Sequence, residues 1–469
     1  MTTELLSPTV ATPPSSVSRA EAFRFWLKLG CISFGGPAGQ IALMHEELVE
    51  RRRWISENRF LHALNYCMVL PGPEAQQLAT YIGWLMHRTW GGIVAGGLFV
   101  LPSLLLLIAL SWVYMAFGST PAIAGLFYGI KPAVTALVVH AAWRVGSRTL
   151  KNAWLWAIAV ASFVAIFALS LPFPLIVLMA GLIGYVGGKV APDKFKAGGS
   201  HGAAQQGHGP ALIDDDTPTP AHVRFNWVRL RGVLLLSLTL WGTALGSLTA
   251  VFGWDGVLTQ MGWFFTKAAL LTFGGAYAVL PYVYQGAVDH FQWLTGPQMI
   301  DGLALGETTP GPLIMVVAFV GFVGGWTTQI FGSDALWLAG AAAAMVVTFF
   351  TFLPSFVFIL LGGPFIESTH GNLKFTAPLT GITAAVVGVI VNLAVFFAYH
   401  VLWPQGLVGS FEWASAVIGL VAALALFRFK AGVISVVLGA GLAGLVFQLG
   451  EARVLSAVAA VVMPEWVLR

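Results

Sequence analysis

The chain has 469 residues, of which 9% are charged and 57% hydrophobic, and its mean hydropathy is +0.81. A soluble domain carries about 25% charged residues. This composition therefore excludes a soluble globular protein and predicts that most of the surface faces lipid. The net charge of +4 favours no soluble partner, and no feature of the sequence supports nucleic-acid binding.

The long apolar runs predict transmembrane helices, because they are apolar on every side and close to the about 20 residues that cross a bilayer. The strands of a barrel would alternate apolar and polar residues instead. Residues 1–19 are rich in Ser, Thr and Pro and predict a disordered tail without a cleaved signal. The predicted segments in chain order are 20–50, 57–86, 93–117, 122–143, 154–171, 173–188, 231–253, 257–288, 296–327, 335–361, 376–400, 412–427 and 432–449. The predicted fold class is therefore an all-α polytopic membrane protein.

The chain contains an internal repeat. An offset of 239 residues carries Lys28 onto Lys267, and Trp54 onto Trp293. The same offset carries Phe34-Gly35-Gly36 onto Phe273-Gly274-Gly275, and Pro71-Gly72-Pro73 onto Pro310-Gly311-Pro312. Because Gly, Pro and Trp do not align at one offset by chance, we infer that the two halves arose by duplication.

The repeat and the composition divide the chain into segments. We predict an N-terminal repeat over 20–188, a flexible cytoplasmic linker over 189–230, a connecting transmembrane helix over 231–255, a C-terminal repeat over 256–453 and a tail over 454–469. Three linker histidines, His201, His208 and His222, are irregularly spaced and predict no metal site. Cys31 and Cys67 belong to no metal or redox motif and are interpreted as core residues. No cofactor is expected.

The positive charges predict opposite orientations for the two repeats. Cytoplasmic loops of membrane proteins collect Lys and Arg, so the cluster 51–53 with Arg59 marks the cytoplasmic side of the first half. The matching stretch around Asp289 has no Lys or Arg, and residues 392–400 also lack the counterparts of Arg144 and Arg148. We therefore predict an inverted repeat with broken or re-entrant helices.

The glycine and proline motifs predict where a substrate binds. Inverted-repeat transporters hold their substrate near the midplane, where helices are broken. Proline interrupts a helix and glycine lets the backbone approach a ligand closely. A helix that restarts after the break points free N–H groups and the positive end of its dipole at the gap, which suits an anion. The predicted substrate-binding residues at the breaks are Phe34, Gly35, Gly36, Pro71, Gly72, Pro73, Phe273, Gly274, Gly275, Pro310, Gly311 and Pro312.

Charged and polar side chains near the breaks supply further candidates. Lys28 and Lys267 each precede a glycine of the break by seven residues, about two helical turns, and are predicted to bind a dianion, or alternatively to reach the membrane surface. Glu74 and Glu307 are predicted to carry protons, since two ionised acids would repel an anion. Hydrogen bonds to the anion are predicted from Gln76, Gln77, Thr308 and Thr309, with polar packing between helices as the alternative. The remaining ionisable residues are interpreted as interfacial, namely His45, His62, Asp289 and Asp301.

Several longer stretches resemble one transporter family. FWLKLGCISFGGPAGQIALM, VERRRWIS and MVLPGPEAQQLATYIGW in the first half, with TFGGAYAVLPYV and ETTPGPLIMVVAFVG in the second, resemble the chromate ion transporter family, whose long members are fused duplicates. The resemblance implies a carrier of the bacterial inner membrane that expels chromate and confers resistance. It also implies opposite orientation of the halves. Ala276 stands where the first half has Pro37, so the two breaks need not be equivalent.

The predicted function is secondary active export of chromate, driven by the proton gradient or the membrane potential. The alternative is a carrier of sulfate or another tetrahedral oxyanion, and a passive channel would share the same breaks. A membrane-embedded enzyme would need a nucleophile with its base or a metal motif such as HExxH, and neither is found. The predicted partners are the oxyanion and membrane lipid, and a homodimer is left open.

Overall fold

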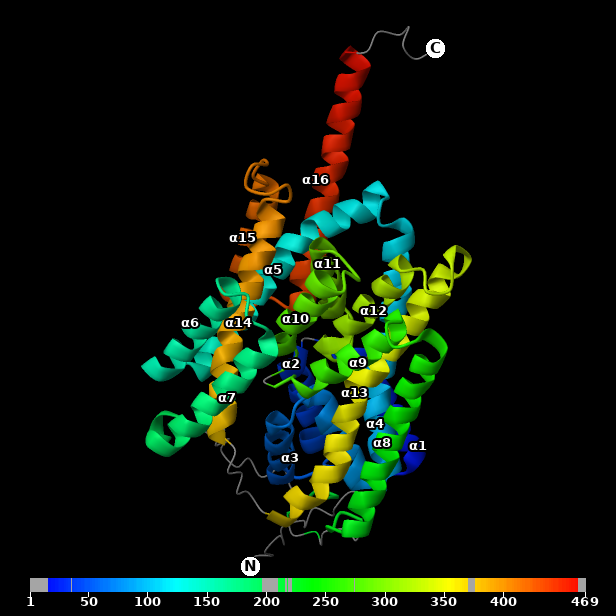
Figure 1. The fold of residues 1–469 in the computed structure, drawn as a ribbon, viewed down its shortest axis with the longest axis vertical. Coiled ribbons are helices and arrows are strands. Elements are labelled where there is room, and N and C mark those ends of the chain that lie inside the picture. The colour runs from blue at the N-terminus through cyan, green and yellow to red at the C-terminus, as the bar shows by residue number, and fades with distance from the viewer. Residues whose placement is uncertain are drawn as a thin grey trace, which may run out of the picture.

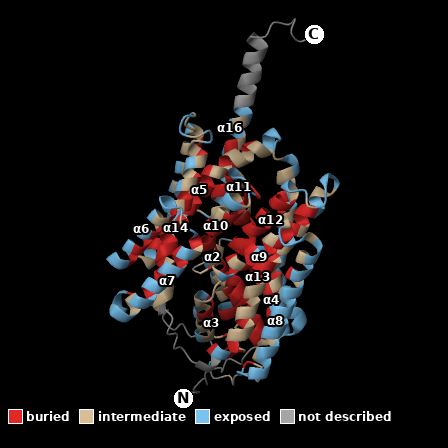
Figure 2. Ribbon diagram, viewed as in Figure 1, coloured by how far each residue is buried: buried red, intermediate tan, exposed pale blue. Residues whose placement is uncertain are grey.

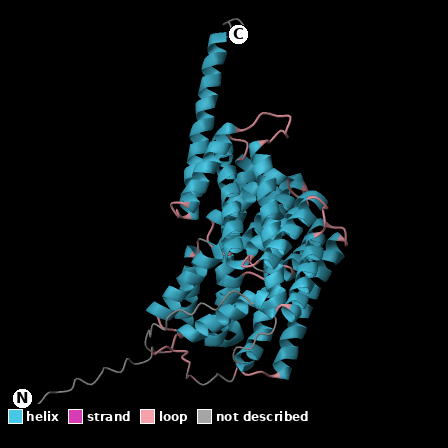
Figure 3. Cartoon of the chain, turned by 90° about the vertical axis from the view of Figure 1, so that its left-hand side faces the viewer, coloured by secondary structure: helices cyan, strands magenta, loops and turns pink. Residues whose placement is uncertain are grey.

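The computed structural model describes residues 16–34, 36–195, 210–215, 217, 222–273, 275–369 and 376–462. Over these residues Figure 3 shows helices joined by loops, and the only strand-like pairing is an isolated bridge between Ile55 and Ile213. Seven of the described helices are long and apolar enough to cross a membrane. The predicted all-α membrane fold is therefore confirmed.

The first repeat opens with a helical hairpin. α1 (Arg19–Ile32) is followed by α2 (Gly36–His45) and the π-helical turn η1 (Glu46–Arg51). Arg52, directly after η1, lies 3.8 Å from Glu21 near the start of α1. The two arms therefore lie side by side, and residues 33–34 form the tip between them.

The second hairpin joins α3 (Glu57–Val69) to the first part of α4 (Glu74–Phe117). The backbone of α4 reverses at Arg88, where φ is +59° and ψ is −161°. Gly92 consequently lies against Thr80, and we call residues 74–86 and 89–117 the short and long arms of α4. α1, α3 and the short arm have at most 14 residues, about 21 Å of helix. Since the hydrocarbon core is about 30 Å thick, each of them reaches only part of the way across.

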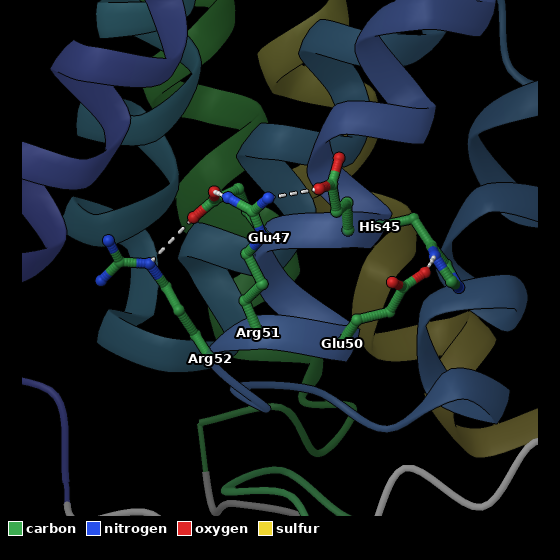
Figure 4. A network of polar contacts seen from close by, with 6 residues as sticks. His45, Glu47, Glu50, Arg51 and Arg52 are labelled. Atoms are coloured by element: carbon green, nitrogen blue, oxygen red, sulfur yellow. Dashed lines mark hydrogen bonds and ion pairs between the residues drawn. The ribbon is translucent and has the colours of Figure 1, made fainter.

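Charged side chains fix the outer end of the first hairpin, as Figure 4 shows. Glu47 accepts hydrogen bonds from Arg51 at 3.0 Å and from Arg52 at 3.3 Å. The Arg52 guanidinium also lies 5.1 Å from the ring centre of Trp54. The equivalent turn of the second repeat, η3 (Gln285–His290), contains no Lys or Arg. The arginine cluster therefore belongs to one end of the molecule only.

The second repeat begins with two hairpins of the same kind. The third hairpin consists of α9 (Val257–Leu270), α10 (Ala276–Tyr284) and η3 (Gln285–His290). The fourth consists of α11 (Gly296–Thr308), the short helix η4 (Leu313–Met315) and α12 (Val316–Thr327). Gly302 of α11 lies against the Phe319 ring of α12, so these arms are antiparallel as well.

Long helices follow the hairpins in each repeat. The first repeat continues with α5 (Pro121–Thr149), α6 (Ala153–Phe167), α7 (Phe173–Val190) and the turn η2 (Pro192–Lys194). The second repeat continues with the turn η5 (Ser333–Ala335), α13 (Leu336–Thr369), α14 (Thr376–Leu402), α15 (Trp413–Phe427) and α16 (Val433–Val462). α8 (Trp227–Phe252) lies between the repeats and buries only Leu245, so it forms an outer surface of the molecule (Figure 2).

The long arm of α4 and its counterpart α13 pack together and run antiparallel. Phe365, near the end of α13, contacts Phe225 in the segment before α8. Tyr114, near the end of α4, instead contacts Phe319 of the second repeat. In Figure 1 α3 lies toward one end of the molecule, and α16 projects from the other.

The repeat extends to backbone conformation. Positive φ angles recur at the 239-residue offset, in the pairs Gly36 (+70°) and Gly275 (+96°), Gly72 (+130°) and Gly311 (+109°), and Arg53 (+51°) and Gln292 (+54°). L-residues with a side chain rarely adopt such angles. Their recurrence supports the duplication inferred from sequence.

Part of the predicted linker is docked on the first repeat. The main chain of Ile213 exchanges hydrogen bonds with Trp54 and Ser56, at 3.1 and 3.0 Å. Asp215 accepts hydrogen bonds from the side chains of Ser56 and Asn58, both at 2.6 Å. His222 contacts the backbone oxygen of Trp84 at 3.1 Å, whereas His201 and His208 lie outside the described residues. The described linker segments are therefore held against α3 and α4 rather than free.

The predicted segments 20–50, 57–86, 257–288 and 296–327 are each divided at the glycine and proline breaks, as predicted, because the tip residues leave the helical conformation. The bounds of α8 and α16 differ from the predicted ones. α8 begins at Trp227, inside the stretch predicted as linker, where the Asn226 side chain accepts hydrogen bonds from two backbone N–H groups and so caps the helix. α16 continues to Val462, through most of the predicted tail.

We predict that Gly311→Ala destabilises the protein by about 1–3 kcal/mol, the usual cost of a residue forced into a sparsely populated conformation. A Cβ at this position would also lie 2.7 Å from the Cβ of Ser103. The measurement is the thermal midpoint of the detergent-solubilised protein. Gly97→Ala is the control, since a Cβ there meets nothing within 4 Å. Equal midpoints for the two variants would contradict the prediction.

Candidate functional site

The tips of the four hairpins meet in the interior, and they exchange backbone hydrogen bonds reciprocally. We use "the tips" for residues 33–34, 71–73, 272–273 and 309–312. Gly72 N–H donates to Thr272 O at 2.7 Å, and Gly311 N–H donates to Ser33 O at 2.8 Å. Since the offset relates Gly72 to Gly311 and Ser33 to Thr272, these are one contact made twice. Such reciprocity is typical of two units related by a two-fold axis.

A second pair of reciprocal contacts surrounds the first. Gly72 lies so close to Ser355 of α13 that a Cβ would be 2.5 Å from its hydroxyl. Gly311 approaches Ser103 of α4 in the same way. Both serines follow a proline in equivalent helices, and both are fully or almost fully buried. Only glycine permits backbone this close to a neighbouring helix.

Glutamine side chains supply the donors that the tip carbonyls require. Gln40, which is 1% exposed, donates from Nε2 to Gly311 O at 2.6 Å and to Ser33 O at 3.2 Å. Gln77 donates from Nε2 to Pro71 O at 2.8 Å. The Oε1 atoms of Gln40, Gln76 and Gln77 are buried without a hydrogen-bond partner. The tips are therefore rich in polar groups, some of them unpaired.

Helices restart directly after each tip. α2 begins at Gly36, α4 at Glu74, α10 at Ala276 and η4 at Leu313. The first N–H groups of a helix have no partner within that helix, and its N-terminus carries a partial positive charge. The carbonyls of Ser33, Pro71, Thr272 and Gly311 already accept hydrogen bonds from protein donors. The backbone groups left without a partner at the tips are therefore N–H donors, the kind of group that binds an anion.

Charged side chains border the tips. Glu74 is half-buried at the start of α4, and its carboxylate is 3.9 Å from the place of a Cβ at Gly275. Glu307 is 6% exposed and accepts a short hydrogen bond from the Tyr277 hydroxyl. Arg144 of α5 is half-buried and within electrostatic range of Glu307 and Tyr277, but no ion pair joins it to Glu307 in the described part of the chain. Two acids therefore lie beside the break, with a cation further away.

The structure brings some predicted site residues together and leaves others apart. Most predicted site residues lie at or beside the tips and differ in exposure. The buried ones are Gly72, Pro73, Gln76, Thr309, Pro310, Gly311 and Pro312. Gly36, Pro71, Phe273 and Gly275 are partly exposed, and Phe34 is exposed. Lys28 is exposed on the face of α1 that points away from α4. Lys267 lies over the exposed ring of Trp263, 5.7 Å from its centre. Neither lysine is brought to the tips, and Gly35 and Gly274 lie outside the described residues.

Three residues at or near the tips were missed by sequence reasoning as site residues: Gln40, Arg144 and Tyr277. Gln40 is a polar residue inside an apolar segment, which is a signal for an internal role. Arg144 was interpreted as a loop cation, but it lies within α5. Its effect on Glu307 depends on the proximity of residues far apart in sequence, so no local pattern could have revealed it.

Two cavities lie away from the tips. The smaller, of about 220 Å³, is lined by Trp84, Arg88, Thr89, His222 and Arg229, beside the docked linker. The larger, of about 470 Å³, lies between α4, α5, α11, α14 and α15 and includes Tyr114, Lys131 and Asp301. Asp301 was interpreted as interfacial, but it is only 2% exposed.

Comparison with protein families matches residues 20–185 and 259–445 to the family described as chromate transporter. The two matched stretches follow the two structural repeats and cover most of the chain. The chain belongs to the chromate transporter family. It is therefore a multi-pass membrane protein of a transporter family, in its long duplicated form.

Individual relatives agree with this assignment. The chromate transport protein of Pseudomonas aeruginosa is 35% identical over 445 residues, which cover 93% of this chain and 94% of the relative. The chromate transport protein of Cupriavidus metallidurans is 29% identical over 93% of this chain and 95% of its own length. The probable chromate transport protein of Synechococcus elongatus is 28% identical over 79% and 82%. No solved structure matches the chain.

We predict that Gln40→Leu destabilises the protein by about 1–3 kcal/mol, because it leaves the buried Gly311 carbonyl without its side-chain donor. The thermal midpoint in detergent measures the loss. Gln405→Leu makes the same chemical change at an exposed position in the loop before α15 and serves as the control. If both variants melt together, Gln40 does not hold the tips.

Proposed function

We propose that this protein exports chromate from the bacterial cytoplasm as a secondary active transporter of the inner membrane and so confers chromate resistance. Membership of the chromate transporter family supports an oxyanion as substrate. The names of the relatives from Pseudomonas aeruginosa and Cupriavidus metallidurans support chromate. The observation that carries the proposal is the convergence of four helix starts on tips whose carbonyls already have donors.

A dianion at the tips would be bound by backbone N–H groups, by Arg144 and by the second N–H of the Gln76 and Gln77 amides, whereas Gln40 already donates twice to tip carbonyls. The arginine guanidinium presents several donors in a fixed plane, which suits the oxygens of an oxyanion. Glu74 and Glu307 are proposed to be protonated when the anion is bound, because two ionised carboxylates beside it would repel it. Proton exchange at these acids would couple the transport of protons to the transport of the anion.

The two repeats are proposed to be inverted across the membrane. Three features support this: the antiparallel course of α4 and α13, the reciprocal tip contacts, and arginines at the base of the first hairpin only. Hairpins that enter from opposite sides and meet at their tips form a closed barrier. Rocking one repeat against the other would then open the site to each side in turn.

Charge distribution supports export. The smaller cavity, which holds Arg88 and Arg229 beside the docked linker, would attract anions at the end predicted to be cytoplasmic. Burial lowers the pKa of His222 in the same cavity, so this histidine adds little positive charge at neutral pH. A cell that is negative inside favours exit of a dianion by about 2.3 kcal/mol per charge per 100 mV. The membrane potential or a proton gradient can therefore drive the cycle.

Sulfate remains the alternative substrate. Chromate and sulfate are both tetrahedral dianions, and backbone N–H groups with one arginine recognise charge and shape rather than the central atom. Competition between the two anions decides between them. The third possibility, a membrane-embedded enzyme, has no support in a nucleophile–base pair or metal cluster among the described residues.

The proposal is tested with inside-out vesicles that contain the protein, labelled chromate outside and an imposed gradient. Wild type is expected to accumulate chromate. Arg144→Gln should reduce accumulation at least about tenfold, since a hydrogen bond to a charged group contributes about 1.5–3 kcal/mol. Glu74→Gln should abolish gradient-dependent accumulation.

Arg148→Gln is the matched control, because Arg148 lies one turn further along α5 and is exposed. Lys28→Ala and Lys267→Ala test the predicted role of these lysines in substrate binding. If both variants keep full transport activity, neither lysine binds the substrate. Sulfate transport without chromate transport would change the substrate and keep the site. Equal loss in Arg144→Gln and Arg148→Gln would contradict the assignment of Arg144.

A further inference from the structure

The larger cavity contains an ion pair between a buried carboxylate and a partly exposed lysine, which the proposed anion site does not use. Lys131 Nζ of α5 lies 3.4 Å from Asp301 Oδ2 of α11, and the Tyr114 hydroxyl donates to the same oxygen at 2.8 Å. The other carboxylate oxygen, Oδ1, is buried without a hydrogen-bond partner. An ionisable group inside a membrane is costly and usually functional. The unpaired Oδ1 atom of the Asp301 carboxylate can therefore accept a proton.

The charges of this cavity suit a proton and not a second oxyanion. Apart from Lys131 and Asp301, its titratable groups are Tyr114 of α4, Tyr128 of α5, His400 of α14 and Glu412 before α15. α12, and α16 as far as Gly450, contribute no titratable side chain. Two acids face one permanent cation, so a dianion would be repelled. A metal cation at Asp301 would meet the Lys131 ammonium, which already occupies that place.

The same two helices connect this cavity to the tips. α5 carries Lys131 and Arg144, and α11 carries Asp301 and Glu307. Six residues separate the two acids, about 9 Å along α11. One ion pair therefore joins the two helices in the cavity, and the same two helices also carry Arg144 and Glu307. Loss of the Lys131–Asp301 pair would change the packing of α5 on α11.

We propose that Asp301, paired with Lys131 in this cavity, is a binding site for the coupling proton. This inference rests on the proposed export of an oxyanion. Helices α5, α11 and α15, which line the cavity, lie in Figure 1 toward the end from which α16 projects, away from α3, so the cavity would take up protons from the external side. A proton added to Oδ1 neutralises the carboxylate and leaves Lys131 without its counter-charge. The Lys131–Asp301 contact, which we call the α5–α11 clamp, then weakens, and the two repeats separate on that side.

The test compares two kinds of transport in proteoliposomes. Wild type is expected to exchange labelled chromate at equal pH and to accumulate it when a pH gradient is imposed. Asp301→Asn and Lys131→Met should both keep exchange and lose the accumulation driven by pH. The first variant cannot bind the proton, and in the second a buried carboxyl without its cation stays neutral. Asp334→Asn, at an exposed acid before α13, should behave as wild type.

The double variant Asp301→Asn with Lys131→Met separates coupling from a structural role. A merely structural pair is replaced without leaving a lone buried charge, so recovery of pH-driven accumulation in the double variant would overturn the proposal. Retained exchange with no pH drive supports it.

Infrared titration of the purified protein gives a readout that needs no substrate. A carboxyl band present in wild type and absent in the double variant supports protonation of Asp301. The absence of such a band from wild type overturns the proposal. Should wild type show the band but move no chromate, the proposed substrate fails and the proton site stands.

Discussion

The structure depends on one constraint: broken helices inside a membrane must find partners for their backbone polar groups within the protein. The tips meet this constraint by exchange. Gly72 donates to the second repeat and Gly311 donates to the first, through equivalent bonds of 2.7 and 2.8 Å. Neither repeat could satisfy its own tip alone, which explains why the hairpins are buried against one another. The same exchange leaves the backbone N–H groups of the helix N-termini at the tips without a partner within their helices, and these are the groups that we propose bind the anion.

Symmetry of the backbone contrasts with asymmetry of the side chains. The 239-residue offset places Val279 opposite Gln40, Leu313 opposite Glu74, Met68 opposite Glu307 and His62 opposite Asp301. Each polar group that acts at the tips or in the larger cavity thus has an apolar or different partner in the other repeat. The duplicated backbone gives the two repeats equivalent folds, whereas the divergent side chains make the two repeats chemically distinct. A transporter that takes an anion from one side and a proton from the other requires this difference.

Features that depend on local chemistry could be predicted from the sequence, and features that depend on distant partners could not. The breaks were predictable because glycine with positive φ and proline leave a direct signature, at Gly72 and Gly311 for example. The predicted boundary between the segments 57–86 and 93–117 likewise coincides with the reversal of α4 at His87 and Arg88. Asp301 was interpreted as interfacial because its partner Tyr114 is 187 residues away. Helical spacing placed Lys28 on the face of its glycine, but α1 packs on α4 through other residues.

The energies of the α5–α11 clamp are of the size that alternating access requires. Removing one partner of a buried ion pair costs about 3–5 kcal/mol, and the lower part of that range applies here because Lys131 is 31% exposed. Moving a two-state equilibrium from 1:99 to 99:1 needs about 5.5 kcal/mol. In the proposed mechanism, protonation of Asp301 would therefore supply part of this shift but not all of it. The remainder must come from the anion and Glu307 at the tips, on the same two helices. Neither ligand alone completes the change, which is the condition for coupled rather than leaking transport.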